Sequence, residues 1–172
     1  DADLVEAASA AHRRSFSNMG QICITVNRIL LDKRVHAEFA DILKNLADST
    51  ELGNGLDAGV GYGPCLNQSV IDRVERHKND ALKKGGELLS GGFSPGAYEF
   101  KRGYFYRPTV INNAPLDSLP MTEESYGPIA AVAAYDSESD MLTMANSLEY
   151  GLAAYIYGGD LERIWALADR LE

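Results

Sequence analysis

The sequence lacks the features that mark membrane, secreted and disulfide-rich proteins. No apolar run approaches the ~20 residues that a membrane-spanning helix requires. The first residues, Asp1 to Leu4, lack the basic and apolar parts of a secretion signal. The two cysteines, Cys23 and Cys65, cannot form a dense disulfide framework, and the three histidines match no zinc-binding spacing. We therefore expect a cytoplasmic protein with no disulfide, no structural metal and no membrane partner.

Positive charge is also scarce. The chain carries 16 Lys and Arg residues against 25 Asp and Glu residues, which gives a formal net charge of -9. No basic stripe follows a segment or a helix face, so the sequence excludes nucleic acid as a partner. What is present is an ordinary hydrophobic share of 45% over 172 residues, enough for one globular core.

Segments with helical apolar spacing alternate with short apolar or β-branched runs. Helices are predicted from an Asp3–Glu6 capping box to about Phe16, from a cap at Asp32 through Leu46, from Asn67 to Gly85, from a Ser137–Asp140 capping box to Gly151, and from a cap at Asp160 to Leu171. Strands are predicted at Ile22–Leu31, Leu88–Leu89, Ile129–Tyr135 and Leu152–Tyr157, while Pro108 makes the run Tyr104–Ile111 an edge strand or a strand end. This alternation predicts an α/β domain with a mostly parallel sheet and right-handed crossovers.

Cys23 is the first candidate for chemistry, because it follows a turn that contains Gly20. A thiol becomes a nucleophile when it is partly exposed and stabilised as thiolate, and such a turn can present it in this way. Taken alone, a cysteine between Ile22 and Ile24 is more often an inert buried residue. The local pattern therefore leaves both interpretations open.

A longer match decides between them. The run Phe16-Ser17-Asn18-Met19-Gly20-Gln21-Ile22-Cys23 resembles the active-site segment of the NAD(P)-dependent aldehyde dehydrogenase family, with the pattern Phe-x-Asn-x-Gly-Gln-x-Cys. Three further segments resemble the family in the same order, namely Asp1-Ala2-Asp3-Leu4, Gly63-Pro64 with Asn67, and Gly103-Tyr104-Phe105 with Pro108-Thr109-Val110. The resemblance implies the family's three-layer catalytic domain, a mostly parallel sheet covered by helices, and Cys23 as its nucleophile.

The segment Glu123-Glu124-Ser125-Tyr126-Gly127-Pro128 is similar to the family's Glu-Glu-x-Phe-Gly-Pro. By that resemblance Glu124 hydrogen-bonds the nicotinamide ribose, and the ring of Tyr126 packs beside the nicotinamide. A carboxylate suits two ribose hydroxyls because it offers acceptors only. The change from Phe to Tyr adds a hydroxyl that needs a partner if it is buried. An isolated Glu pair would be a solvated turn, but its place downstream of the cysteine segment favours the functional interpretation.

Other reactive side chains receive structural roles. Cys65 occupies a loop position where the family pattern has an apolar residue, so we expect a packed thiol there. His12, His36 and His77 each fall in a predicted helix, and none has a spacing to Cys23 that nominates a catalytic pair. Core or surface positions are expected for all three histidines.

Parts of the family's machinery are not found in the sequence: the general-base Glu of a Glu-Leu-Gly-Gly segment, the oxyanion Asn, the dinucleotide-binding domain and the oligomerisation strands. We therefore expect residues 1–172 to be the nucleophile-bearing catalytic domain, truncated at both ends. The resemblance implies a complete enzyme that forms a homo-oligomer and uses NAD or NADP to oxidise a small aldehyde to a carboxylic acid, through a thiohemiacetal and a thioester on Cys23.

The run from Asn146 to Tyr155 favours semialdehydes or small aliphatic aldehydes as substrates of that enzyme. For the 172-residue chain alone we expect no bound cofactor and no turnover. The alternative is a catalytically incomplete, folded module that self-associates through an exposed interdomain face.

Overall fold

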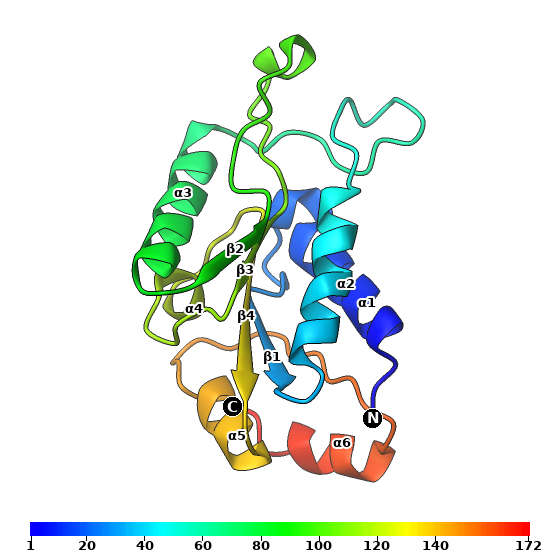
Figure 1. Cartoon of the computed structure of the whole chain (residues 1–172), viewed down its shortest axis with the longest axis vertical. Coiled ribbons are helices and arrows are strands. Elements are labelled where there is room, and N and C mark those ends of the chain that lie inside the picture. The colour runs from blue at the N-terminus through cyan, green and yellow to red at the C-terminus, as the bar shows by residue number, and fades with distance from the viewer.

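The computed structural model describes the backbone of the chain and all side chains except those of Tyr98 and Lys101. Helices and strands alternate along most of its length (Figure 1). In chain order the elements are α1 (Leu4–Phe16), η1 (Ser17–Gly20), β1 (Arg28–Asp32), α2 (His36–Asp48), α3 (Gln68–Lys83), β2 (Glu87–Ser90), η2 (Tyr98–Lys101), β3 (Thr109–Asn112), α4 (Leu119–Thr122), β4 (Ile129–Tyr135), α5 (Glu138–Ala145) and α6 (Leu161–Ala168).

The four strands form one sheet in the order β1-β4-β3-β2. β4 pairs in parallel with both β1 and β3, and β2 is antiparallel to β3. Helices α1 and α2 cover one face of this sheet, and α3 and α4 cover the other (Figure 1). The prediction of a three-layer α/β domain with a mostly parallel sheet is confirmed.

β4 shows why both faces must be covered. Ile129, Ala131 and Ala133 pack into one apolar cluster with Val74 of α3. Ala130 and Val132 alternate with them and belong to the opposite cluster, formed with α1 and α2. Successive side chains of a strand point to opposite faces, so a continuous apolar run requires two cores. The predicted strand Ile129–Tyr135 matches β4 at both ends.

Helix caps were also predicted correctly at several termini. Asp3 Oδ1 accepts hydrogen bonds from the backbone N–H groups of Val5 and Glu6, each at 3.0 Å. Ser137 and Asp140 form the predicted reciprocal capping box at the start of α5. Asp160 caps α6 through its side chain, as predicted, and Asn67 caps α3 in the same way, a role that was not predicted from the sequence. Each cap satisfies N–H groups that the helix itself leaves unpaired.

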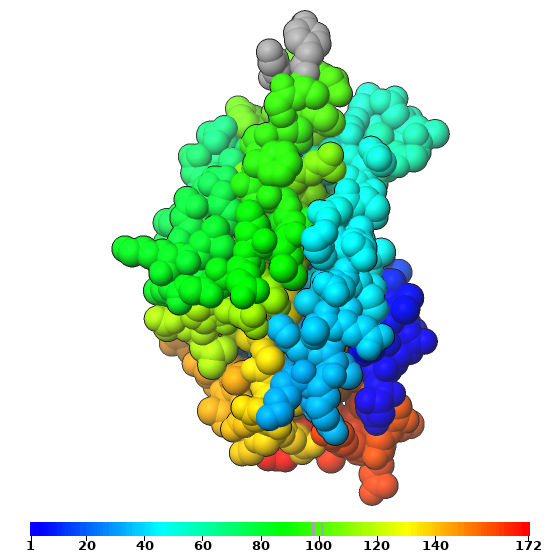
Figure 2. Space-filling view, viewed as in Figure 1, coloured from blue at the N-terminus to red at the C-terminus, as the bar shows by residue number. Residues whose placement is uncertain are grey.

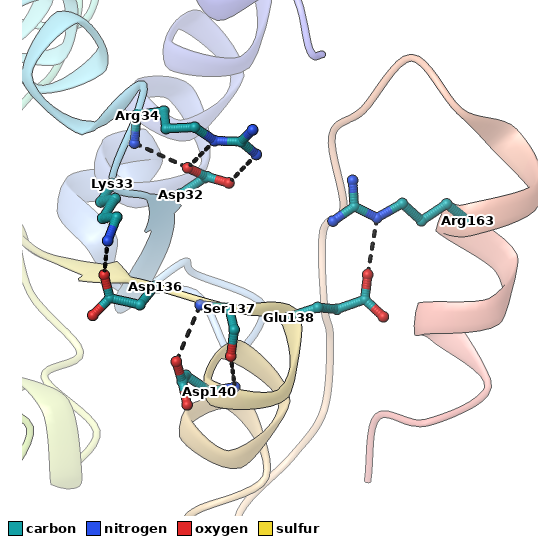
Figure 3. Close-up of polar contacts among 8 residues, drawn as sticks. All are labelled: Asp32, Lys33, Arg34, Asp136, Ser137, Glu138, Asp140 and Arg163. Carbon is teal, nitrogen blue, oxygen red and sulfur yellow. Dashed lines mark hydrogen bonds and ion pairs between the residues drawn. The ribbon is translucent and has the colours of Figure 1, made fainter.

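The predicted cap at Asp32 is wrong. The residue before α2 is Val35, which provides no side-chain cap. The carboxylate of Asp32 instead accepts from the backbone N–H and the guanidinium of Arg34, at 2.9 Å to Oδ1 and 2.6 Å to Oδ2 (Figure 3). Figure 3 also shows Lys33 paired with Asp136, and Arg163 with Glu138 at 2.9 Å. Ion pairs therefore lie at the carboxyl ends of β1 and β4, and one ion pair connects α6 with α5.

Two element boundaries differ from the sequence-based predictions. The predicted strand from Ile22 is shorter at its start, because Thr25 N–H bonds Ile22 O at 3.0 Å in a turn. The helix predicted to end at Gly151 ends at Ala145, where the side chain of Asn146 binds Arg170 O at 2.8 Å.

Pro108 lies at a strand end, which was one of the two predicted interpretations. It has no backbone N–H to donate, and the hydrogen-bonded strand β3 begins at the next residue, Thr109. The edge-strand interpretation is wrong, because β3 lies between β4 and β2.

The predicted strand Leu152–Tyr157 is not formed. This segment is irregular and has no strand partner in the part of the chain that the structure describes. Leu152 is 71% exposed, and Leu161 and Trp165 of the following helix are 67% and 63% exposed. An apolar surface of this kind is the observation on which the alternative of self-association depends, and that alternative stays a prediction.

The described helices are all too short or too polar to cross a bilayer.

The loop of residues 51–64 protrudes at one end of the molecule, opposite the end that contains α5 and α6 (Figure 2).

Candidate active site

The two segments that carry the predicted site enter neighbouring strands. The Cys23 turn precedes β1, and the loop with Glu124 and Tyr126 leads directly into β4. Because β1 and β4 are adjacent and parallel, the residues before them lie at the same edge of the sheet. A hydrogen bond of 3.0 Å from Ala131 N–H to Asn27 O extends this pairing toward the turn.

Two glycines bring these segments into direct contact. Gly20 has a φ of +68°, and a Cβ built on it would lie only 2.2 Å from the carbonyl oxygen of Gly127. On its other side, a Cβ on Gly127 would lie 2.4 Å from Val74 Cγ2 of α3. Only glycine allows so close an approach of one backbone to another, and the left-handed conformation of Gly20 adds a second requirement. The structure therefore brings the Cys23 segment against the segment that contains Glu124 and Tyr126.

The chain before Cys23 takes an unusual path. Asn18 and Met19 have φ values of 52° and 57°, so with Gly20 three successive residues are left-handed. Met19 is 1% exposed and packs in the core on the α3 side, which holds this conformation. The turn closed by Thr25 and Ile22 then places Cys23 at its first central position, with its side chain exposed. Left-handed backbone in residues other than glycine is costly and clusters at functional sites.

Side chains from distant segments fix this turn. Gln21 Nε2 donates to Asn18 O at 2.8 Å, and Gln21 Oε1 accepts from the backbone N–H of Leu66 at 2.9 Å. The hydroxyl of Tyr155 donates to Ile24 O at 3.2 Å. Sequence reasoning missed these roles. Of these residues, only Gln21 carried a sequence signal that could have predicted its role, because it has a fixed place in the motif beside the cysteine.

The two cysteines have opposite surroundings. Cys65 is 3% exposed, and burial raises the pKa of its thiol to about 11. Its backbone N–H bonds Tyr104 O at 2.8 Å within an isolated bridge. Cys65 is a packed thiol, as predicted, whereas the side chain of Cys23 is open to solvent.

We expect iodoacetamide to alkylate Cys23 before Cys65 at neutral pH. Alkylation requires an accessible thiolate, and Cys65 has neither access nor an appreciable thiolate fraction below a pKa of about 11. Peptide mapping by mass spectrometry after brief labelling measures the order. Labelling in denaturant is the control, in which the preference should disappear. Preferential modification of Cys65 in the folded chain would contradict the assignment of Cys23 as nucleophile.

Exposure alternates along the second segment. Glu124 is exposed, Ser125 is 1% exposed, and Tyr126 is 38% exposed with a φ of 45°. Ser125 thus anchors the loop in the protein while its two neighbours face outward. Because Tyr126 is partly exposed, water can satisfy the hydroxyl that distinguishes it from the family's Phe.

The two adjacent glutamates are used differently. Glu123 Oε2 is 2.7 Å from the guanidinium of Arg76, and this hydrogen bond lowers the pKa of the Glu123 carboxyl. Glu124 makes no hydrogen bond or ion pair with the described side chains. The loop therefore presents hydrogen-bond acceptors from an outward carboxylate and a flat apolar surface from an outward aromatic ring.

None of the described hydrogen bonds of the histidines reaches Cys23. His12 Nε2 bonds Thr50 Oγ1 at 2.9 Å, and His77 Nδ1 bonds Ser125 Oγ at 3.0 Å. Both rings lie in helices, as predicted, and burial lowers the pKa of each. Among the described residues there is also no group of three or more side chains suited to a metal ion. The described arrangement therefore offers an exposed thiol and a carboxylate–aromatic pair at one sheet edge.

The structure is thus a three-layer α/β domain in which an exposed thiol and a loop with a carboxylate and an aromatic ring lie at the same edge of the sheet. The chain belongs to the aldehyde dehydrogenase family, whose family model matches residues 1–172.

Three relatives illustrate the likeness. The chain is 39% identical over 172 residues to a succinate semialdehyde dehydrogenase of Acinetobacter baylyi, and 37% identical to the NADP(+) succinate-semialdehyde dehydrogenase of Escherichia coli. Both alignments cover 100% of this chain and 35% of the relative. The crystal structure of a Staphylococcus aureus betaine aldehyde dehydrogenase with NAD+ superposes with a TM-score of 0.95 at 29% identity, covering 99% of this chain and 34% of that one. The chain thus spans about a third of the length of these relatives.

Proposed function

We propose that this chain is the nucleophile-bearing catalytic domain, residues 1–172, of an enzyme that oxidises an aldehyde to a carboxylic acid with NAD or NADP. The observation that supports the proposal most is the backbone contact between Gly20 and Gly127. It joins the segment of an exposed thiol to a segment that presents a free carboxylate and an aromatic ring. An oxidation that proceeds through a covalent adduct needs its nucleophile beside its hydride acceptor.

Cys23 performs the covalent steps in this proposal. Its thiolate attacks the carbonyl carbon of the aldehyde and forms a thiohemiacetal. That carbon then gives up a hydride to the oxidised nicotinamide and its oxygen loses a proton to water, which together leave a thioester on Cys23. Water cleaves the thioester, releases the carboxylic acid and returns the thiol. The backbone N–H of Cys23 donates to no described backbone acceptor, so it is available to the oxyanion of the adduct.

Glu124 and Tyr126 orient the nicotinamide, which supplies the acceptor for the hydride. Glu124 accepts hydrogen bonds from the ribose hydroxyls, and Tyr126 packs its ring beside the nicotinamide. The rest of the machinery, including a general base, a dinucleotide-binding domain and the contacts that would make a homo-oligomer, belongs to the complete enzyme of this proposal. The greater length of the relatives supports such further segments.

The proposed substrates are semialdehydes or small aliphatic aldehydes. The names of two relatives support the semialdehyde branch. The cofactor stays NAD or NADP, because one relative is named for NADP(+) and the compared crystal structure contains NAD+.

In the complete enzyme, we expect Glu124→Gln to slow hydride transfer about 10- to 100-fold and to leave acylation of Cys23 by an activated ester within about twofold. The amide of Gln carries donors that replace one of the two acceptors offered to the ribose, whereas the ester reaction needs neither ribose nor hydride. Single-turnover absorbance of the reduced nicotinamide measures the first rate, and release of the aryl alcohol measures the second.

Glu123→Gln is the matched control, because that side chain already pairs with Arg76. It should leave both rates nearly unchanged. Equal loss of both rates in Glu124→Gln would show that Glu124 is structural, and the cofactor role proposed for it would then be abandoned.

A further inference from the structure

α3 holds the loop of residues 123–127 through four of its own side chains. Arg76 pairs with Glu123 at 2.7 Å, and Arg73 donates to Ser125 O at 3.4 Å. His77 Nδ1 lies 3.0 Å from Ser125 Oγ, and Val74 fills the space beside Gly127. The same helix and its C-cap residue Lys84 also anchor the approach to the loop, because Asp80 accepts from Leu119 N–H at 2.7 Å and Lys84 donates to Asp117 O at 2.6 Å.

The His77–Ser125 bond is the buried contact of this set. His77 is 0% exposed and Ser125 is 1% exposed, whereas both partners of the Arg76–Glu123 pair are about half exposed. A surface ion pair contributes little to position, because solvent screens it and its side chains are long. A buried hydrogen bond between two short side chains fixes their separation, because breaking it leaves polar groups without partners.

The surroundings of His77 favour the neutral form of its ring. Burial and the nearby guanidinium of Arg76 lower the pKa of His77, and Glu123, whose Oε2 is 3.4 Å from Nε2, opposes that shift. Arg76 also lies 3.4 Å from Nε2, and the tautomer decides which nitrogen donates. Either tautomer leaves Nδ1 able to bond the Ser125 hydroxyl, which can both donate and accept.

Ser125 determines where its neighbours point. It is the buried residue between the exposed Glu124 and Tyr126, and the left-handed φ of 45° at Tyr126 persists only if surrounding contacts hold it. Neither Glu124 nor Tyr126 makes a described polar contact of its own that would fix the loop. The anchor at Ser125 therefore sets the direction of both outward side chains.

We propose that His77 is a positioning residue: through its hydrogen bond to Ser125 it holds Glu124 and Tyr126 where the nicotinamide riboside is bound. This inference rests on the function proposed above for Glu124 and Tyr126. It assigns His77 no contact with substrate or cofactor. It predicts that losing the bond impairs the oxidation step and spares attack by Cys23.

Four variants separate positioning from mere packing. His77→Leu and Ser125→Ala each leave the other partner buried without its hydrogen bond, so each should lower the thermal midpoint. The double variant replaces both polar partners with apolar groups and should recover much of that midpoint. His77→Asn keeps a donor and an acceptor near the position of Nδ1 and should preserve the bond to Ser125. His36→Leu on α2, which packs on the opposite face of the sheet, is the control for the loss of a helical histidine.

We expect the recovered double variant to remain slow in hydride transfer by roughly 10- to 100-fold in the complete enzyme, with Cys23 acylation by an activated ester within about twofold of wild type. His77→Asn and His36→Leu should keep near wild-type hydride transfer. Amide hydrogen exchange of residues 123–127 should be faster in the double variant and unchanged in His77→Asn.

Hydride transfer at the wild-type rate in the stable double variant would overturn the inference and leave His77 a packing residue. So would unchanged exchange in residues 123–127. Glu124→Gln separates this failure from failure of the proposed function. If Glu124→Gln also transfers hydride at the wild-type rate, the loop does not serve the cofactor, and the role of His77 falls with it.

Discussion

Replacing Cys23 with Ala is expected to lower kcat for aldehyde oxidation by the complete enzyme by roughly 10⁴-fold or more, because loss of the nucleophile removes the covalent pathway altogether. The other cysteine of the sequence, Cys65, cannot substitute for it, because Cys65 is buried on a different segment with a pKa of about 11. The measurement is formation of the reduced nicotinamide with succinic semialdehyde, together with the mass of the protein after exposure to an activated ester. The variant should show neither turnover nor an acyl adduct at this position.

Cys65→Ala is the matched control for that result. It should retain kcat within about twofold and lower the free energy of unfolding by about 1 kcal/mol, because it truncates a small side chain that is 3% exposed. Cys23→Ala should leave the thermal midpoint close to that of wild type, because its side chain is exposed. Substantial turnover in Cys23→Ala, or its loss in Cys65→Ala, would contradict the proposed mechanism.

Much of the fold could be predicted from local pattern, because its determinants are local. The apolar run of β4 specified a strand covered on both faces, and the Ser137–Asp140 box specified a helix start. The failures occurred where tertiary contacts decide. Asp32 has the residue type of a cap, but Arg34 takes its carboxylate. Leu152–Tyr157 has the composition of a strand, but a strand also requires a partner.

Motif resemblance nominated the residues of the candidate site. Their arrangement in space could not be predicted from the sequence. No periodicity relates Gly20 to Gly127 or His77 to Ser125, because these pairs meet only once β1 lies beside β4 and α3 covers the sheet. Ser125 occupies the variable place of its motif, so its identity carried no indication of a role. The structure turns that position into the anchor between Glu124 and Tyr126.

The contact between Gly20 and Gly127 gives the second large effect. Gly20→Ala is expected to lower the free energy of unfolding by about 3 kcal/mol or more, since a left-handed residue with a Cβ costs about 1–2 kcal/mol and the collision adds to that. The Cβ would lie 2.2 Å from a backbone oxygen, which cannot rotate away. The loops must separate instead, so kcat of the complete enzyme should fall by about 10²-fold or more, as expected for a displacement of about 1 Å.

Gly127→Ala provides a comparison in which the obstacle is a side chain. The Cβ of this variant would meet Val74 Cγ2 at 2.4 Å, and Val74→Ala removes that atom. Gly127 has no positive φ, so an L residue fits its backbone. Chemical denaturation of the single and double variants should therefore show a favourable coupling of about 1 kcal/mol between Gly127→Ala and Val74→Ala. The same Val74→Ala change should give Gly20→Ala no relief, because the group in its way is the Gly127 carbonyl. If Val74→Ala showed the same coupling energy with Gly20→Ala as with Gly127→Ala, the two loops would move together when either glycine is replaced. The contact between Gly20 and Gly127 would then not set the distance between the thiol and the cofactor loop.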